Sequence, residues 1–283
     1  GDMPIYVGLD SVDVWLNQRL FLLREDGRPS VVAGVPPDAY SDIGQLWGNP
    51  LFDWEAMEAD DYQWWCQRVA RMLEHCDALR IDHFIGFSRY WSIDADADDA
   101  RGGQWNQGPG RPLFDALAKK LGPLPLIAED LGALDEGTER LRDDVGLPGM
   151  RVLQFGYDGN PGNPHHPSAA PRLSVVYPST HDTSTARGWW EDLPPDAQET
   201  CALGTKGVDV AERLVKEALD SQAFWSILAV QDILALGDDA RFNVPGTIDG
   251  NWTWRQPVGL LSNDAAKSLR TRIERAGRLG LQA

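Results

Sequence analysis

Residues 77–84 read Asp77-Ala78-Leu79-Arg80-Ile81-Asp82-His83-Phe84, an apolar run that carries an arginine and an aspartate two positions apart. Side chains alternate between the two faces of a β-strand, so a strand here places Arg80 and Asp82 on the same face. A guanidinium beside a carboxylate keeps that carboxylate ionised at neutral pH. The stretch therefore predicts either a reactive carboxylate or a structural ion pair at the end of a strand.

Other apolar segments alternate with helical patterns along the chain. Strands are predicted at 3–9, 124–128, 150–155 and 173–177, and helices at 54–75, 114–121, 134–144, 207–219, 221–235 and 264–276. This alternation is typical of a parallel α/β protein, and polar residues follow the strands at the edge where a (β/α) barrel builds its active site. About six strands are recognisable, whereas a closed barrel has eight. We therefore expect a (β/α)8 TIM-type barrel, with inserted loops and subdomains, that lacks its first strands in this chain.

Two stretches rich in glycine, proline and polar residues, 11–60 and 92–110, interrupt this rhythm. The first includes Pro36-Pro37 and the segment Gly44–Pro50. Long loops within compact domains are usually functional. We expect one barrel domain over residues 1–283, with 11–60 as an irregular substrate-binding excursion and 92–110 as a second irregular stretch.

The composition of the 283 residues is that of a soluble globular protein. No apolar run reaches the length of a membrane span, and the first residues lack the pattern of a signal or transit peptide. The cytoplasm is therefore the expected location. Three cysteines without paired spacing favour reduced thiols over a disulfide framework or a zinc site. The net charge of −17 disfavours nucleic acid and anionic membranes as partners and suits a neutral ligand such as a sugar. The twelve tryptophans fit that ligand, although any of them can equally belong to the core.

Three carboxylic acids stand at predicted strand ends: Asp82, Glu129 and Asp182. Cleavage of a glycosidic bond uses two carboxyl groups, one as nucleophile and one as proton donor. Asp82 has Arg80 beside it, whereas Glu129 follows an apolar strand, where burial raises the pKa toward that of a working acid. Each acid alone is more often an ordinary strand-end carboxylate, but three at successive strand ends indicate a site.

A metallohydrolase is the main chemical alternative, because His83 and His181 also follow strands beside carboxylates. The sequence has no HExxH motif and no His-x-His pair. It also has no GxSxG elbow, no GxGxxG after a strand and no Walker loop. We therefore expect no metal, cofactor or nucleotide.

Several motifs, in order, resemble the amylomaltases, the 4-α-glucanotransferases or disproportionating enzymes of glycoside hydrolase family 77. The matching blocks are Gly1–Val7, Asp13–Trp15, Pro36–Asp38, Gly44–Pro50, Leu79–Phe84, Ala128–Gly132, Thr180–Asp182 and Asn243–Thr247. They span nearly the whole chain, which resembles the larger, C-terminal part of the family's barrel, since members carry a further N-terminal part. The resemblance implies transfer of a 1,4-α-glucan segment from a malto-oligosaccharide or glucan donor to the 4-position of glucose or another glucan, by a retaining double displacement without a cofactor.

By this resemblance Asp82 is the nucleophile, Glu129 the acid/base and Asp182 the third acid, which grips sugar hydroxyls. The substrate-binding residues that it implies are Arg80, His181, Asp38, Tyr40, Gln45, Trp47 and Asn243. The chain departs from the family's pattern at Thr183-Ser184, where Asn-Asp is usual, and at Ile85, where arginine is common. These departures concern sugar contacts and not the three acids. An α-glucan hydrolase of the amylase clan and an inert glucan-binding fragment remain open as alternatives.

Overall fold

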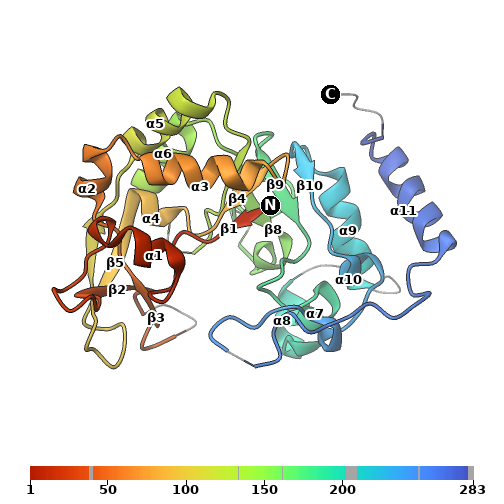
Figure 1. Ribbon diagram of the computed structural model, residues 1–283. Coiled ribbons are helices and arrows are strands. Elements are labelled where there is room, and N and C mark those ends of the chain that lie inside the picture. Colours follow the sequence, from red (N-terminus) through yellow and green to blue (C-terminus); the bar gives the residue numbers. More distant parts are fainter. Residues whose placement is uncertain (38–40, 133, 161, 202–208, 248, 280–283) are drawn as a thin grey trace. The chain divides into compact units, whose positions relative to one another are not determined.

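The computed structural model describes residues 1–37, 41–132, 134–160, 162–201, 209–247 and 249–279 (Figure 1). The chain divides into two compact units, Gly1–Gly149 and Met150–Ala283. The single barrel domain over 1–283 therefore stays a prediction. Within the described residues, every helix is too short or too polar to cross a membrane.

The first unit contains short parallel strands. They are β1 (Asp2–Met3), β4 (Leu79–Ile81) and β7 (Leu126–Ala128), in the order β1-β4-β7, and Ala128 pairs with Gly149, the first residue of β8 (Gly149–Val152). The register places Arg80 of β4 between Asp2 of β1 and Ile127 of β7. The strand predicted within 77–84 is confirmed at Leu79–Ile81. Asp82 follows it directly, and its carboxylate lies 2.9 Å from Nη2 of Arg80, as expected for side chains on the same side of the chain.

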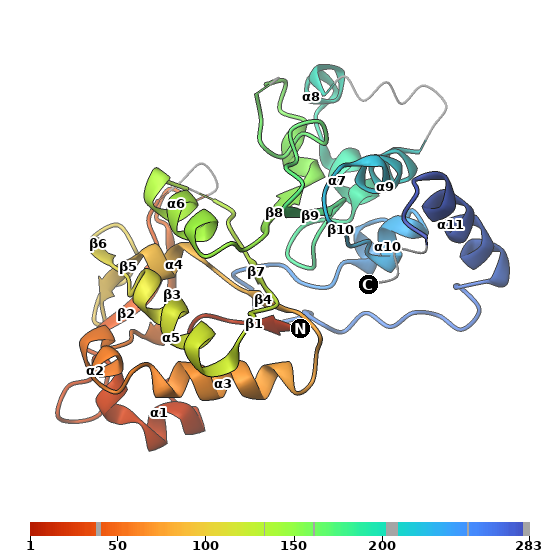
Figure 2. The same ribbon diagram turned by 90° about the horizontal axis from the view of Figure 1, so that it is seen from above.

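The helices of the first unit are α1 (Val12–Leu16), α2 (Trp54–Ala59), α3 (Gln63–Leu73), α4 (Ile85–Ser88), α5 (Arg111–Leu121) and α6 (Glu136–Asp144), with the 3-10 turn η1 (Gln18–Leu20). Helix α3 packs against α5, and the two lie side by side in both views (Figures 1 and 2). The helix predicted at 54–75 is interrupted because Asp61 and Tyr62 have left-handed backbone angles, φ 58° and 53°. Helices α2 and α3 result.

The strand predicted at 3–9 ends at Met3, so that prediction was wrong beyond its first residue. The backbone carbonyls that would continue a sheet are bonded by a side chain instead. Arg68 of α3 donates to the carbonyl oxygens of Pro4, at 2.7 Å, and Ile5, at 2.9 Å. Pro4 also lacks the N–H that an inner strand needs.

The stretches 11–60 and 92–110 were wrongly expected to be irregular. They supply most of a four-stranded antiparallel sheet in the order β3-β2-β5-β6, formed by β2 (Val31–Val35), β3 (Gln45–Pro50), β5 (Arg89–Asp94) and β6 (Gln104–Gln107). Close strand contact explains a glycine in β2, because a Cβ atom on Gly34 would lie 2.2 Å from the carbonyl oxygen of Gln45. Trp91 and Trp105 face each other across β5 and β6, with ring centroids 5.3 Å apart.

In the second unit, β8, β9 (Ser174–Tyr177) and β10 (Trp225–Ser226) lie in that order, and β9 and β10 are parallel. The helices are α7 (Ala186–Asp192), α8 (Pro195–Thr200), α9 (Val210–Asp220), α10 (Val230–Ile233) and α11 (Asn263–Arg275), with the 3-10 turns η2 (Leu153–Gly156) and η3 (Asp238–Ala240). The helix predicted at 221–235 was wrong, because β10 and α10 occupy that stretch.

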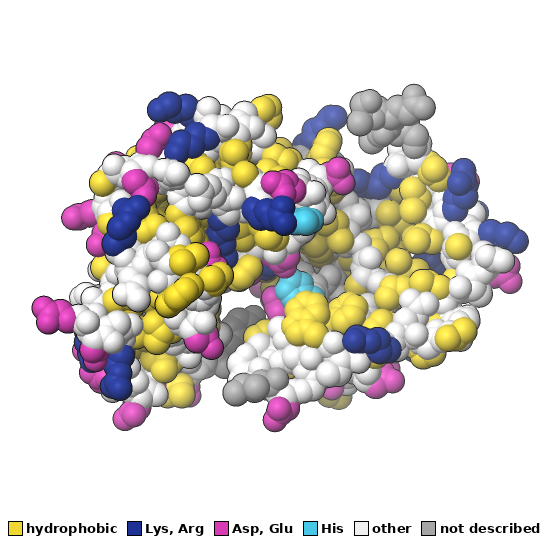
Figure 3. All heavy atoms as spheres, in the orientation of Figure 1, with side chains coloured by type: hydrophobic (Ala, Val, Ile, Leu, Met, Phe, Trp, Pro, Cys, Tyr) yellow, Lys and Arg dark blue, Asp and Glu magenta, His cyan; other side chains and the backbone are white. Residues whose placement is uncertain are grey.

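The tryptophans divide between core and surface. Trp64 and Trp65 are buried in the core of the first unit, where Trp65 contacts Phe52 and Phe87. Trp15, Trp47, Trp225 and Trp252 are exposed. Acidic side chains are scattered over the face seen in Figure 3, among basic and apolar groups. On that face, the negative charge is not gathered in one patch.

The start of β8 has no room for a side chain. A Cβ atom on Gly149 would lie 2.2 Å from Oδ2 of Asp130, which is buried and pairs with Nη1 of Arg142 at 2.5 Å. We predict that Gly149→Ala lowers the free energy of unfolding by about 1–3 kcal/mol, because Asp130 must move from its ion pair. Chemical denaturation measures this. Gly102→Ala, where a Cβ atom meets open space, is the control. A Gly149→Ala protein as stable as the control would show that Asp130 moves freely.

Candidate active site

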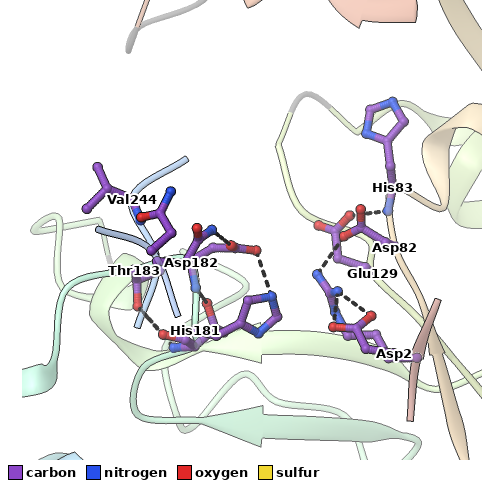
Figure 4. Close-up of polar contacts among 12 residues, drawn as sticks. Asp2, Asp82, His83, Glu129, His181, Asp182, Thr183 and Val244 are labelled. Carbon is purple, nitrogen blue, oxygen red and sulfur yellow. Dashed lines mark hydrogen bonds and ion pairs between the residues drawn. The ribbon is translucent and has the colours of Figure 1, made fainter. Parts of the chain in front are cut away.

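Arg80 lies between two carboxylates in the first unit. Its Nη1 atom donates to Oδ1 and Oδ2 of Asp2, at 2.8 and 2.9 Å, and its Nη2 atom lies 2.9 Å from Oδ1 of Asp82 (Figure 4). The side chain of Arg80 is 11% exposed, whereas that of Asp82 is 40% exposed. Burial alone would lower the pKa of Arg80, but the carboxylates of Asp82 and Asp2 raise it above its usual range. The cation is therefore permanent, and Asp82 is held by it while remaining open to a ligand.

Glu129 follows β7 and is only 9% exposed. Burial raises the pKa of Glu129 to about 8; the charge of Arg80 opposes this shift and the charge of Asp82 reinforces it. Backbone N–H groups of His83, at 2.6 Å, and Leu131, at 3.1 Å, donate to its two carboxyl oxygens. Glu129 is therefore largely protonated at neutral pH, and its carboxyl group is fixed in position.

His83 contributes its backbone to this cluster. Its φ of 51° lies in the left-handed region, which side-chain-bearing residues rarely adopt, and this conformation accompanies the hydrogen bond from its N–H to Glu129. The imidazole points away from both carboxyl groups (Figure 4). Burial lowers the pKa of His83 to about 4, so the ring is neutral at neutral pH.

Two of the predicted substrate-binding residues lie on β3 beside this cluster. The ring of Trp47 is 4.8 Å from that of His83, edge to face, and its Nε1 atom donates to Oε1 of Gln45 at 3.0 Å. Trp47 is 37% exposed. The first unit thus places Trp47, with Gln45 bonded to it, against the ring of His83, the residue that follows Asp82. Asp38 and Tyr40 lie outside the described residues.

The second unit contains the remaining predicted residues, around Asp182 after β9. His181 Nε2 lies 3.1 Å from Oδ2 of Asp182, and Nδ2 of Asn243 donates to Oδ1 at 2.6 Å (Figure 4). The ring of Trp252 lies 5.3 Å from that of His181 and stacks on Phe242 at 5.9 Å. Each oxygen of the Asp182 carboxylate therefore has a partner from a predicted site residue.

Three contributors escaped the sequence analysis: Asp2, Arg241 and the backbone of His83. Asp2 lies in the block Gly1–Val7, but nothing in the sequence assigned it a role. Arg241 stands two positions before Asn243, and this spacing was its only signal. The role of His83 depends on a backbone angle that no sequence pattern predicts. Among the residues that the structure describes, no group of three or more His, Cys, Asp and Glu side chains is placed to hold a metal ion.

A family model described as 4-alpha-glucanotransferase, glycoside hydrolase family 77, matches residues 1–260. The chain belongs to this family. It is 44% identical to a chloroplastic/amyloplastic 4-alpha-glucanotransferase of Solanum tuberosum, with 99% of this chain and 50% of the relative covered. It is 43% identical to a 4-alpha-glucanotransferase of Thermus thermophilus, with 99% and 58% covered. The chain thus spans about half the length of these relatives.

Solved structures show the same relationship. An amylomaltase from Streptococcus agalactiae in complex with acarbose has a TM-score of 0.94 and 38% identity, with 98% of this chain and 57% of that chain covered. An amylomaltase from Corynebacterium glutamicum, at 19% identity, shares the fold with a TM-score of 0.75. These matches confirm the expected α/β fold, and the parallel strands with their helices fit the barrel of family 77.

The raised pKa of Glu129 predicts a basic limb in the pH profile. If Glu129 must donate a proton, kcat/KM for α-1,4-glucan cleavage falls as pH rises through about 8, because the free enzyme loses that proton. Initial rates on maltotriose between pH 5 and 10 measure it, at roughly one-unit steps. Glu129→Gln should cleave an α-maltosyl fluoride, whose fluoride leaves without a proton, with no such limb. Persistence of the limb in Glu129→Gln would assign it to another group.

Proposed function

We propose that the protein is a 4-α-glucanotransferase that moves a segment of a 1,4-α-glucan to the 4-hydroxyl of an acceptor, glucose or another glucan. The observation that carries this proposal is the contrast between two neighbouring carboxyl groups. Asp82 is open and ion-paired, whereas Glu129 is buried with a pKa of about 8. A nucleophile and a proton donor need these opposite states.

In the first step, a carboxylate oxygen of Asp82 bonds to the anomeric carbon of the donor. The glycosidic bond breaks, and Glu129 gives its proton to the departing 4-oxygen. The products are a glycosyl ester on Asp82 and a shortened glucan that leaves. Arg80, which is held by Asp2, keeps its positive charge throughout, so that it stabilises the Asp82 carboxylate before the ester forms and again when the ester is broken.

The second step reverses the roles. Formation of the ester removes the negative charge of Asp82, and that charge is one of the causes that raise the pKa of Glu129. The pKa of Glu129 therefore falls in the intermediate, which suits its new role as a base. Glu129 takes the proton of the acceptor hydroxyl, the acceptor oxygen bonds to the anomeric carbon, and Asp82 is released as a carboxylate.

Transfer requires that a sugar hydroxyl reach the ester more often than water does. Trp47 supports this, since its partly exposed indole lies against His83, the residue next to Asp82. An apolar ring there excludes water and offers a face to a glucosyl ring. Gln45, bonded to the indole, holds that ring in place. We propose substrate-binding roles for both residues.

We further propose that Asp182, with His181 and Asn243, binds hydroxyl groups of the reacting sugar. Their hydrogen-bonded arrangement leaves Asp182 partly exposed and fixes its carboxylate. Carboxylate contacts to sugar hydroxyls that strengthen in the transition state contribute to rate. By family pattern, Asp38 and Tyr40 belong to the same binding role.

The ligands we propose are malto-oligosaccharide or glucan donors and glucan or glucose acceptors. The acarbose bound by the Streptococcus agalactiae relative supports an oligosaccharide ligand. The net charge of −17 supports the absence of nucleic acid and anionic membranes among the partners. Cys66, Cys76 and Cys201 are free thiols, which supports a reducing compartment such as the cytoplasm, although the plant relatives are named as chloroplastic.

The distribution of products tests this function. Purified protein given maltotriose should yield glucose together with a ladder of longer glucans, because the glycosyl ester passes to sugar acceptors. Total reducing ends should rise little, since each transfer makes one new linkage for each linkage cleaved. Chromatography of the glucans and a reducing-sugar assay measure both quantities.

Asp82→Asn, nearly isosteric, is the control that removes the nucleophile while leaving the fold intact, and it should give no ladder. Reducing ends that rise in step with maltotriose consumption, without longer products, would mean that the protein is a hydrolase.

A further inference from the structure

Arg241 makes several hydrogen bonds around Asp182 in the second unit. Its Nη2 atom donates to the backbone oxygen of Asp182 at 2.9 Å, and its Nε atom donates to the backbone oxygen of Asn243 at 2.8 Å. Its Nη1 atom donates to Oγ of Ser184 at 3.1 Å and lies 3.7 Å from Oδ2 of Asp238. One planar guanidinium therefore contacts both the β9–α7 turn, residues 178–185, and the segment that carries Asn243.

The contacts of Arg241 support the hydrogen bond between Asn243 and Asp182. Asn243 donates its Nδ2 proton to Oδ1 of Asp182 at 2.6 Å, and Arg241 holds the backbone of the donor residue and of the acceptor residue at once. The geometry of that bond thus depends on a group that takes no part in it. The guanidinium suits this role because its donors are fixed in a rigid fork.

The rest of the turn is anchored at its far end. Thr185 is the N-cap of α7. Its backbone N–H donates to Oδ1 of Asp238 at 2.8 Å, and its hydroxyl donates to the backbone oxygen of Leu236, also at 2.8 Å. The backbone N–H of Ala186 donates to the buried Asp232 at 2.8 Å. These bonds secure the start of α7, three and four residues after Asp182. Arg241 acts closer, at Asp182 itself.

We propose that Arg241 is a positioning residue for the third acid: by bonding the backbones of Asp182 and Asn243, it sets the orientation in which the Asp182 carboxylate meets the sugar. This inference rests on the proposed function. Ser184 is part of the arrangement, because its hydroxyl accepts the hydrogen bond from Nη1 of Arg241. The partly buried guanidinium acts through its neighbours and is not itself a catalytic residue.

Kinetics of Arg241→Gln and Arg241→Lys on maltotriose test the proposal. A shift of the order of 1 Å in a positioned group costs about 100-fold in rate. We expect Arg241→Gln to lower kcat about 100-fold with KM little changed, because the contact matters most in the transition state. Arg241→Lys keeps the charge without the fork and should lie between Gln and wild type. Arg270→Gln, on the exposed face of α11, is the matched control and should retain wild-type kcat.

A double-variant cycle separates positioning from general support of the fold. If Arg241 acts on Asn243 and Asp182, then Arg241→Gln should cost much less kcat in an Asn243→Ala background than in wild type. Circular dichroism and thermal unfolding confirm that each variant is folded. Equal losses in the two backgrounds, or wild-type kcat in Arg241→Gln, overturn the proposal. If wild-type protein fails to form longer glucans at all, the proposed function fails first, and independently of Arg241.

Discussion

Burial of the Glu129 carboxyl group beside the charge of Asp82 is the constraint on which the candidate site depends. An ionised carboxylate that lost its water without compensation would be costly by several kcal/mol. Glu129 avoids this cost by holding a proton, as its pKa of about 8 indicates. The backbone N–H groups of His83 and Leu131 then fix the orientation of the protonated carboxyl group. Arg80 performs the complementary task, since it neutralises Asp82 and is itself held by Asp2 across the β1–β4 pair.

The raised pKa of Glu129 makes the stability of the fold depend on pH. The folded pKa of Glu129 lies above its ordinary value of 4.5, so the folded state binds the proton more tightly than the unfolded chain does. The resulting contribution to stability is fully present below pH of about 4.5 and is lost as pH rises toward about 8. The left-handed backbone of His83 adds a strain of about 1–3 kcal/mol at the same place. This strain is tolerated beside a buried core in which Phe84 and Ile81 are almost fully covered.

Local periodicity predicted the centre of this site and failed around it. The Arg80-Ile81-Asp82 spacing gave the ion pair, because a strand returns to the same face every second residue. The apolar run Leu126–Ala128 before Glu129 indicated a buried strand, and Glu129 at its end is buried as well. The sheet β3-β2-β5-β6 escaped prediction because its strands carry Gly34, Gly48 and polar residues, and because it forms through pairing between segments far apart in the chain. The contacts of Arg241 are likewise long-range, and residue spacing alone does not encode them.

The most direct measurement is the identity of the residue that carries the sugar during turnover. A 5-fluoro-α-glucosyl fluoride donor forms the glycosyl ester quickly enough to accumulate and slows its breakdown, so the labelled protein can be digested and its peptides weighed and sequenced. A retaining double displacement at this site predicts the added mass of one fluoroglucosyl group on Asp82, within the peptide that contains Leu79–Phe84. A label on Glu129 or Asp182, or steady transfer with no labelled carboxylate, would contradict it.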